Sequence, residues 1–398
     1  MIFAIFWRRA TYCSFKTTFP IIYEVEMKKE IAVVFGGKSC EHDISVITAL
    51  YVYNALNAQK YNKHAVYLRD GQFYSGKKLE ELESYIDFKE NSFKKVIFNN
   101  GCMKYVNKPF KAGIKIDCAL LCAHGGEGEN GALQGYFEVC GIPYTSCGVL
   151  ASGLCMDKVM CKYMLKALGY NILPYVALHK GQQQSFEKIA EKCGLPFIIK
   201  PARLGSSIGI SIANDKKQAE EGFKLAFEYD NKVLVEKCLK NFIEINCAAM
   251  RFENEIVAGL PERPLSDNAF LSYEDKYINY VKYQPKREYP AKISKEKTLE
   301  IQRLTKRLYE DFEMSGVVRI DYLIDGEEIY VNEINTIPGS LAHYLFTKQG
   351  ITSAKLLDNI INQSIKEKAE KDKLISSFCS NVLAHYKGSK NAPPMLNK

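Results

Sequence analysis

The 398-residue chain has no apolar run of about eighteen residues, the length that a membrane-spanning helix needs, so we expect no membrane span. It also has no basic block, because its 54 lysines and arginines are scattered among 46 acidic residues and spread out the net charge of +8. This pattern argues against a nucleic acid partner and favours a solvated surface with an anionic small-molecule substrate. The length suits two or three globular domains.

Paired C-x-x-C sets are also missing, although the chain has thirteen cysteines. The odd count does not fit a complete disulfide framework. The close spacings, Cys118 with Cys122 and Cys155 with Cys161, do not form the ligand pairs of a structural zinc site. We expect reduced thiols, many at core positions, in a cytoplasmic protein. A structural zinc site is the less favoured alternative.

Two glycine loops lack the nucleotide-binding fingerprints that they resemble at first sight. Residues 36–43 follow an apolar strand but have no spaced third glycine, which argues against a dinucleotide site. In residues 200–209, Lys200 precedes the glycines and no helix follows at once, so this is not a Walker A loop. Its small residues still let backbone N–H groups approach an anion while Lys200 supplies charge. A plain hairpin turn is the alternative.

The most informative stretch is residues 319–339, where polar and apolar residues alternate on both sides of an Asp-Gly turn. This pattern predicts a β-hairpin. Side chains two residues apart share a strand face, so Arg319 lies beside Asp321, and Glu333 lies beside Asn335.

The two pairs share one face only if the hairpin loop has an odd number of residues, and we predict a three-residue loop at 325–327. Asp321, Glu333 and the amide oxygen of Asn335 would then form a hard oxygen site suited to Mg²⁺ on nucleotide phosphates. The neighbouring guanidinium would suit an oxyanion. The alternative is an ordinary solvated strand face.

Two further positions have a functional and a structural interpretation. Glu236 ends the strand predicted at 233–236, where its carboxylate could accept from an adenine amino group while the backbone of residues 237–239 reads the adenine edge. A strand-end salt bridge is the equally supported alternative. His124 follows a buried strand, and a lone histidine in such a place is more often structural than functional.

Four segments are expected along the chain. Residues 1–27 form an extension that is disordered or comes from a mis-called start, and residues 28–150 form an α/β substrate-binding domain. Residues 151–240 form a central domain, and residues 241–398 form a C-terminal domain with the metal site and a frayed tail. The order of strands, glycine turns and helices predicts an α/β (α+β) fold with an N-terminal doubly wound parallel sheet.

Nine motifs in order resemble the D-alanine–D-alanine ligase family of ATP-grasp enzymes, and the resemblance covers residues 29–357. The motifs are GGKSCEHDIS from Gly36, AHGGEGENGALQG from Ala123, GIPYTSCG from Gly141, MDK from Met156, IIKPARLGSSIGI from Ile198, VEKCL from Val235, SYEDKY from Ser272, RID from Arg319 and NEINTIPG from Asn332. So many ordered matches make coincidence negligible.

The resemblance implies a three-domain ATP-grasp architecture and the ATP-dependent ligation of two D-alanines through an acyl phosphate, for peptidoglycan precursor synthesis. It also implies ATP and two Mg²⁺ ions, with Mn²⁺ as a substitute, and a homodimer in the cytoplasm. The alternatives are a mixed D-Ala-D-Ser type ligase and a non-catalytic ATP-binding relative. The second is disfavoured by the presence of Lys200, Arg319, Asp321, Glu333 and Asn335.

Roles for single residues follow from the resemblance alone. The metal ligands would be Asp321, Glu333 and Asn335. The residues around ATP would be Lys158, Lys200, Ser207, Glu236, Lys237, Leu239, Glu244 and Lys276. The residues around D-alanine would be Glu41, His124, Gly339, Ser340 and Leu345. The catalytic residues would be Glu41, Ser206, Tyr277, Arg319 and Tyr344, with Ser206 hydrogen-bonded to Glu41 and to Tyr277 of a loop that closes over the intermediate.

One position departs from the family pattern. Much of the family has a serine that helps to hold the carboxylate of the second substrate, and this chain has Tyr344 there. Ser340 or the backbone N–H of Leu345 is a substitute donor. Tyr277 follows Lys276, as in the members that form dipeptides, and this favours an amine over a hydroxy acid as the nucleophile.

Overall fold

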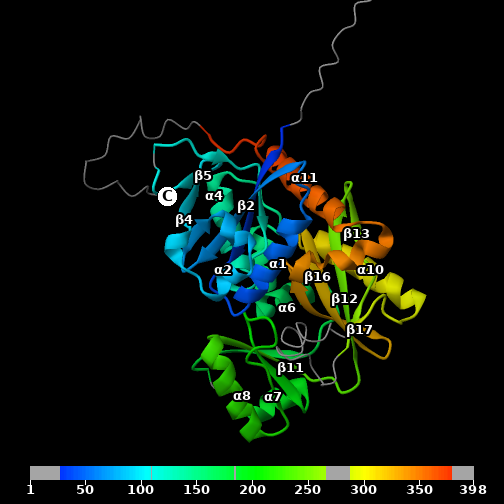
Figure 1. Ribbon diagram of the computed structural model, residues 1–398. Coiled ribbons are helices and arrows are strands. Elements are labelled where there is room, and N and C mark those ends of the chain that lie inside the picture. Colours follow the sequence, from blue (N-terminus) through cyan, green and yellow to red (C-terminus); the bar gives the residue numbers. More distant parts are fainter. Residues whose placement is uncertain (1–26, 109, 183–184, 266–286, 379–398) are drawn as a thin grey trace, which may run out of the picture.

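The computed structural model describes residues 27–108, 110–182, 185–265 and 287–378, and three main β-sheets organise them (Figure 1). A seven-stranded sheet, blue to cyan in Figure 1, is followed along the chain by a green four-stranded sheet and then by a second four-stranded sheet in lime to orange. Residues 1–26, Lys276, Tyr277 and the last residues of the tail lie outside the described ranges, so the expectations for them stay predictions.

The seven-stranded sheet is mixed. β1 (Lys29–Gly36) lies between β2 (Tyr61–Arg69) and β7 (Cys118–Leu121) and pairs in parallel with both. Residues 31–35 are fully buried, as a continuous apolar run in a central parallel strand requires. Beyond β2, four antiparallel strands continue the sheet: β3 (Gln72–Ser75), β4 (Lys94–Asn99), β5 (Cys102–Tyr105) and β6 (Ile114–Lys115). The sequence pattern had not revealed this antiparallel half.

Helices from both ends of the chain cover this sheet. α1 (His42–Ala55) packs on β1, and α11 (Ser353–Lys371) packs against α1 and β7. Leu356, Ile360 and Ile361 of α11 therefore share a hydrophobic core with β1, which ties the C-terminal segment to the N-terminal sheet. The other helical segments of this region are η1 (Lys77–Glu80), α2 (Glu83–Ile86), η2 (Glu90–Ser92), α3 (Gly126–Glu129) and α4 (Ala132–Cys140).

The middle of the chain begins with two helices, α5 (Val149–Met156) and α6 (Lys158–Ala167). Asp157 separates them, and its carboxylate caps α6 by accepting from the first backbone N–H groups. The antiparallel sheet that follows has the order β10-β9-β11-β8. Its elements are β8 (Tyr175–His179), α7 (Phe186–Cys193), β9 (Phe197–Pro201), β10 (Ser211–Ala213), α8 (Lys216–Tyr229) and β11 (Lys232–Lys237).

The last sheet has the order β13-β12-β16-β17. α10 (Lys295–Asp311) covers one face, where its Ile301 and Leu308 share a core with Ile320 and Tyr322. The opposite face carries the polar residues of the predicted hairpin. The elements of this region are β12 (Ile243–Phe252), β13 (Glu255–Ala258), β14 (Arg263–Pro264), β15 (Arg287–Glu288), β16 (Val317–Asp325), β17 (Glu328–Asn335) and η4 (Gly339–Gln349).

The hairpin of β16 and β17 is present, but the predicted three-residue loop is wrong. Asp325 pairs with Glu328, so the loop contains only Gly326 and Glu327. Gly326 has a φ of 59°, the left-handed conformation that a tight turn requires of one of its residues.

A β-bulge supplies the odd residue that the prediction had assigned to the loop. Tyr322 pairs with Val331, whereas Asp321 pairs with Glu333, so Asn332 is an extra residue on β17. One extra residue reverses which side chains of the two strands share a face, because side chains alternate with a period of two. The bulge therefore brings Asp321 and Glu333 to the same face.

Candidate functional site

Four polar side chains gather on the open face of the hairpin, and we call them the hairpin site: Arg319, Asp321, Glu333 and Asn335. Arg319 pairs across the strands with Asn335 in the register that places Asp321 opposite Glu333. The Arg319 guanidinium donates from Nε to Asp321 Oδ1 over 2.7 Å and from Nη2 to Oδ2 over 2.8 Å. Asn335 Nδ2 donates to Asp321 Oδ2 over 3.1 Å.

The guanidinium of Arg319 and the carboxylate of Asp321 stabilise each other's charged form. Burial alone would lower the pKa of Arg319, but the carboxylate of Asp321 outweighs it and keeps that pKa well above its ordinary value. The guanidinium is therefore charged at every physiological pH, and its planar fork matches an oxyanion as well as a carboxylate.

Lys158 connects the hairpin site to the central sheet. It begins α6, and its Nζ donates to Glu333 Oε1 over 2.6 Å and to the carbonyl of Leu204 over 2.9 Å. Burial lowers the pKa of Lys158, but the adjacent Glu333 carboxylate raises it further, so the net direction is upward. Leu204 belongs to residues 200–209, which we call the glycine-serine loop, so one ammonium group joins three separate segments.

A buried ionic cluster lies next to this junction, and we call it the Glu236 cluster: Glu236, Lys162 and Lys200. Glu236 Oε1 lies 2.6 Å from Lys162 Nζ, and Oε2 lies 2.7 Å from Lys200 Nζ. Burial would raise the pKa of Glu236, but the two lysines lower it to about 2. The strand-end salt bridge offered as the alternative for Glu236 is therefore present.

Lys162 was not among the predicted site residues, although the sequence held a signal for it. α6 buries Val159, Cys161, Lys162 and Leu165, so a lysine occupies the apolar stripe of an amphipathic helix. A lysine at such a position requires a charged partner, and Glu236 on β11 provides it.

The glycine-serine loop meets the N-terminal sheet through Glu41. Ser206 Oγ donates to Glu41 Oε1, which is the contact expected from the sequence, and Ser206 has a φ of 55°. The Glu41 carboxylate also fits between two glycines. A Cβ on Gly125 would lie 2.6 Å from Glu41 Oε2, and a Cβ on Gly205 would lie 2.7 Å from the same atom. Glycine is required at both positions for this close approach.

Glu129 of α3 is a second residue that the sequence did not single out. Its carboxylate accepts from the backbone N–H of Gly125 over 2.7 Å and from that of Ile337 over 3.0 Å. Burial, with the nearby Glu41 charge, raises the pKa of Glu129 to about 7. The contact holds the N-terminal loop against the segment that follows the hairpin.

His124 is a buried neutral histidine. Burial lowers the pKa of His124 to about 4, and its Nε2 lies 2.8 Å from Thr48 Oγ1. The same hydroxyl accepts from the Ser340 backbone N–H over 3.1 Å. His124 therefore supports the position of the Ser340 segment through Thr48.

The segment expected around the second substrate has an unusual backbone. Ser340, Leu341 and Ala342 have φ values of 49°, 51° and 43°, a left-handed turn without glycine. Further along, the Tyr344 hydroxyl donates to Glu262 Oε1 over 2.6 Å, and the Arg287 guanidinium lies 4.4 Å from the centre of the Tyr344 ring. The phenol that replaces the expected serine is thus engaged by a buried carboxylate.

The remaining predicted residues lie around these groups. Glu244 is on β12, opposite Leu323 of β16, and Leu239 packs with Leu323 in a small core. Lys237 ends β11, Ser207 has a φ of 59° beside Ser206, and Gly339 begins η4. Leu345 is buried, and its carbonyl accepts from the Tyr289 hydroxyl over 2.9 Å.

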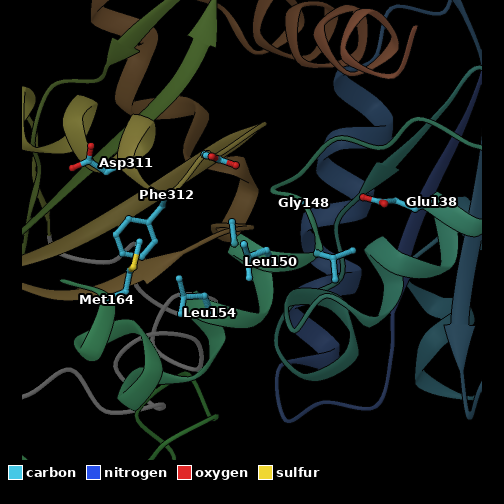
Figure 2. Close-up of a pocket in the computed structure, with 10 residues that line it drawn as sticks. Glu138, Gly148, Leu150, Leu154, Met164, Asp311 and Phe312 are labelled. Carbon is cyan, nitrogen blue, oxygen red and sulfur yellow. The ribbon is translucent and has the colours of Figure 1, made fainter. Parts of the chain in front are cut away.

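The cysteines of the described residues and a pocket among these residues lie outside the hairpin site and the Glu236 cluster. The cysteines in the described ranges are free thiols, as expected. Among these residues no three His, Cys, Asp or Glu side chains gather as a metal centre, and no helix is long and apolar enough to cross a membrane. A pocket of about 360 Å³ lies between α4, α5, α6 and the end of α10, lined in part by Glu138, Leu150, Leu154, Met164 and Phe312 (Figure 2). It contains none of the predicted site residues.

Comparison with known proteins identifies the family of this chain. A family model described as the D-ala D-ala ligase N-terminus matches residues 30–147, and one described as the D-ala D-ala ligase C-terminus matches residues 164–362. The D-alanine–D-alanine ligase of Thermosipho melanesiensis is 40% identical over 357 residues, which are 89% of this chain and 98% of the relative. That of Thermosipho africanus is 34% identical, over 88% of this chain and 97% of the relative.

Solved structures show the same fold. The D-alanine-D-alanine ligase of Coxiella burnetii superposes with a TM-score of 0.75 at 25% identity, over 87% of this chain and 98% of its own. The VanG D-Ala:D-Ser ligase of Enterococcus faecalis has a TM-score of 0.73 at 29% identity, over 85% of this chain and all of its own. These matches confirm the predicted α/β ATP-grasp architecture. With family models on both halves and relatives matched over nearly their full length, this chain belongs to the D-alanine–D-alanine ligase family.

Proposed function

We propose that this protein ligates two D-alanine molecules to D-alanyl-D-alanine, using ATP, for peptidoglycan precursor synthesis. The observation that carries the proposal is the meeting of three groups at one junction. Lys158 of α6 hydrogen-bonds to Glu333 of the hairpin site and to the carbonyl of Leu204, and Ser206, two residues after Leu204, hydrogen-bonds to Glu41. These groups come from distant parts of the chain. Carboxylates for a cation, ammonium groups for phosphates and a guanidinium for an oxyanion are what the reaction requires at a single place.

The hairpin site fits a divalent cation by its donor set. Asp321 and Glu333 offer carboxylate oxygens and Asn335 offers an amide oxygen, the hard ligands that Mg²⁺ prefers. We propose that these three residues hold two Mg²⁺ ions, with Mn²⁺ as a substitute. When bound, the metal neutralises phosphate charge during transfer. Arg319 and Lys158 pair with the two carboxylates, and we propose that they contact phosphate oxygens when ATP binds.

A cluster of lysines supports phosphate binding. In the Glu236 cluster, Lys162 and Lys200 share one carboxylate, so this cluster has one more positive than negative charge. An anionic ligand next to Lys200 would balance that charge. We propose that Lys158 and Lys200 contact the phosphates of ATP, with Ser207 and, outside the described ranges, Lys276.

The adenine would lie at the end of β11. The backbone of residues 237–239 leaves that strand, and Leu239 contributes apolar surface. Both oxygens of Glu236 already contact lysines, so an adenine amino group would share an oxygen with one of them. Glu244 on β12 would contact the ribose.

The chemistry then proceeds in two steps. A carboxylate oxygen of the first D-alanine attacks the γ-phosphorus of ATP, and ADP leaves. The amine of the second D-alanine, after losing a proton, attacks the carbonyl carbon of the acyl phosphate, and phosphate leaves. We propose that Glu41 holds the ammonium of the first D-alanine and that Arg319 stabilises the oxyanion of the tetrahedral intermediate. Ser206, with Tyr277, would close the site over the acyl phosphate.

The decisive experiment measures phosphate release from ATP and Mg²⁺ with D-alanine, D-serine or D-lactate, followed by mass analysis of the product. We expect phosphate release with D-alanine and a product with the mass of D-alanyl-D-alanine. A dominant D-Ala-D-Ser product from mixed substrates would reassign the second substrate. No phosphate above the ATP-only background with any of them would reject the ligase activity. We also propose a homodimer, which light scattering of the purified protein would test.

A further inference from the structure

Lys162 is more deeply buried than Lys158 and Lys200, the other two lysines around the candidate site. It leaves 1% of its surface exposed, on the second turn of α6, and its Nζ lies 2.6 Å from Glu236 Oε1. Lysine is rarely buried to this degree without a functional or structural counterion. Neither the sequence motifs nor the roles proposed above assign it a task.

The fold fixes how Lys162 and Lys200 share one carboxylate. Lys200 of β9 pairs across the sheet with Leu234, two residues before Glu236, so Lys200 and Glu236 are diagonal neighbours on one face. α6 covers this face, because its Val159 packs on Leu234. Lys162 therefore reaches Glu236 from the helix while Lys200 reaches it from the strand.

The two lysines differ in what else they can reach. The side chain of Lys162 is 2% exposed, whereas that of Lys200 is 13% exposed. Only Lys200 can therefore contact a ligand. With Lys162 present, the cluster has two positive charges and one negative charge, and its surplus is available at Lys200. Without Lys162, the negative charge of Glu236 would cancel the positive charge of Lys200, and the cluster would have no net charge.

We propose that Lys162 is a positioning residue for ATP. It pairs with one oxygen of the Glu236 carboxylate, so Lys200 keeps a net positive charge for the phosphates. The inference rests on the proposed binding of ATP at this junction. In a purely structural role, Lys162 would stabilise the fold without favouring phosphate over the rest of the nucleotide. The two roles differ in how ATP and adenosine respond to its loss, because adenosine has no phosphate.

The test measures binding of Mg²⁺-ATP and of adenosine by calorimetry, without D-alanine, to the Lys162→Met, Lys162→Arg and Lys166→Met variants. Lys166 is exposed on the last turn of the same helix and serves as the matched control. We expect Lys162→Met to weaken ATP binding at least about tenfold, the effect of roughly one ionic contact, and to change adenosine binding less than threefold. Lys162→Arg keeps the charge and should recover most of the ATP affinity, and Lys166→Met should match the wild type.

A double variant tests the charge argument directly. Lys162→Met with Glu236→Gln leaves Lys200 as the one charge of the cluster, so the ratio of ATP to adenosine affinity should rise above that of Lys162→Met alone. Equal losses for ATP and adenosine in Lys162→Met would overturn the inference, and so would an unchanged ratio in the double variant. If Lys162→Met does not fold, the ratios for Lys162→Arg and the double variant decide. Failure of the wild type to bind ATP would instead reject the proposed function.

Discussion

The hairpin site and the Glu236 cluster both hold carboxylates against cations, but they differ in burial. In the pair of Lys158 with Glu333, the side chains are 12% and 29% exposed, whereas in the pair of Lys162 with Glu236 they are 2% and 1% exposed. Partly exposed pairs are screened by water and exchange partners at low cost, while buried pairs do so only at a large one. The comparison separates charges that ligands can recruit from charges that set the local potential.

This difference explains why the same ionic chemistry serves two purposes in adjacent places. In the hairpin site, Arg319 and Lys158 are bound to the carboxylates that we assign to the metal, so a bound metal and a phosphate would exchange with them. In the Glu236 cluster the carboxylate remains ionised at every pH of interest, because its pKa is lowered to about 2. Under the proposed function, the first region would rearrange around ligands, and the second would keep Lys200 positively charged for them.

The largest effect is expected from Glu333→Gln in the hairpin site. The substitution keeps the shape but removes the charge that Mg²⁺ requires, so phosphate release should fall at least about a hundredfold. The melting temperature should change little, because the lost ion pair is partly exposed. Glu328→Gln, at the exposed start of the same strand, is the control and should keep full activity. Undiminished turnover at saturating Mg²⁺ would remove Glu333 from the site.

Arg319→Lys should lose about a hundredfold in kcat/KM, which is the typical effect of removing a transition-state donor. An ammonium group cannot offer the two parallel donors that Nε and Nη2 direct at Asp321, and it would fit an oxyanion equally poorly. Steady-state kinetics with D-alanine would measure the loss. Arg303→Lys, on the exposed side of α10, is the matched control. A variant within threefold of the wild type would contradict the role of the guanidinium.

The Glu236 cluster should stabilise the fold in a pH-dependent way. The pKa of Glu236 is about 2 in the folded protein, against an ordinary value of 4.5. The stabilisation is therefore complete above about pH 4.5 and declines as the pH falls toward 2. The shift corresponds to roughly 3 kcal/mol of unfolding free energy. Glu236→Gln should therefore be much less stable than the wild type at pH 7, and the difference in unfolding free energy should be smaller at pH 3. Denaturant unfolding at both pH values measures this difference. The same difference at both pH values would contradict the ion-pair account.

Periodicity predicted the hairpin residues, but only three-dimensional contacts explain how they meet. Alternation placed Arg319 beside Asp321, and the structure confirms it with two hydrogen bonds. The shared face of Asp321 and Glu333 depends on a bulge at Asn332, where two successive polar residues, Asn332 and Glu333, interrupt the apolar alternation. The prediction did not use this signal. The prediction that Asp321 and Glu333 share a face was therefore correct, but the cause that it gave, a three-residue loop, was wrong.

Contacts between segments far apart in the sequence could not be predicted from local sequence patterns. The Glu41–Ser206 contact was expected only because of the family resemblance, since nothing near either residue indicates the other. Lys162 had a local signal, a charge on the apolar stripe of a helix, but its partner is on a strand far along the chain. Such pairs depend on how the sheets pack, and spacing rules within one element cannot predict them.

The smallest effect is expected at the edge of the hairpin site, where Tyr344 contacts Glu262. Tyr344→Phe removes only the hydroxyl that donates to Glu262 Oε1, and it leaves a buried carboxylate with one donor fewer. We expect a loss of about 1–3 kcal/mol in unfolding free energy. If the phenol also shapes the second-substrate subsite, the KM for the second D-alanine should rise, with a smaller change in kcat. Tyr163→Phe, at an exposed position of α6, is the matched control. Stability and KM both equal to the wild type would show that the Tyr344 hydroxyl is dispensable and that Glu262 is held by Arg287 and Asn246 instead.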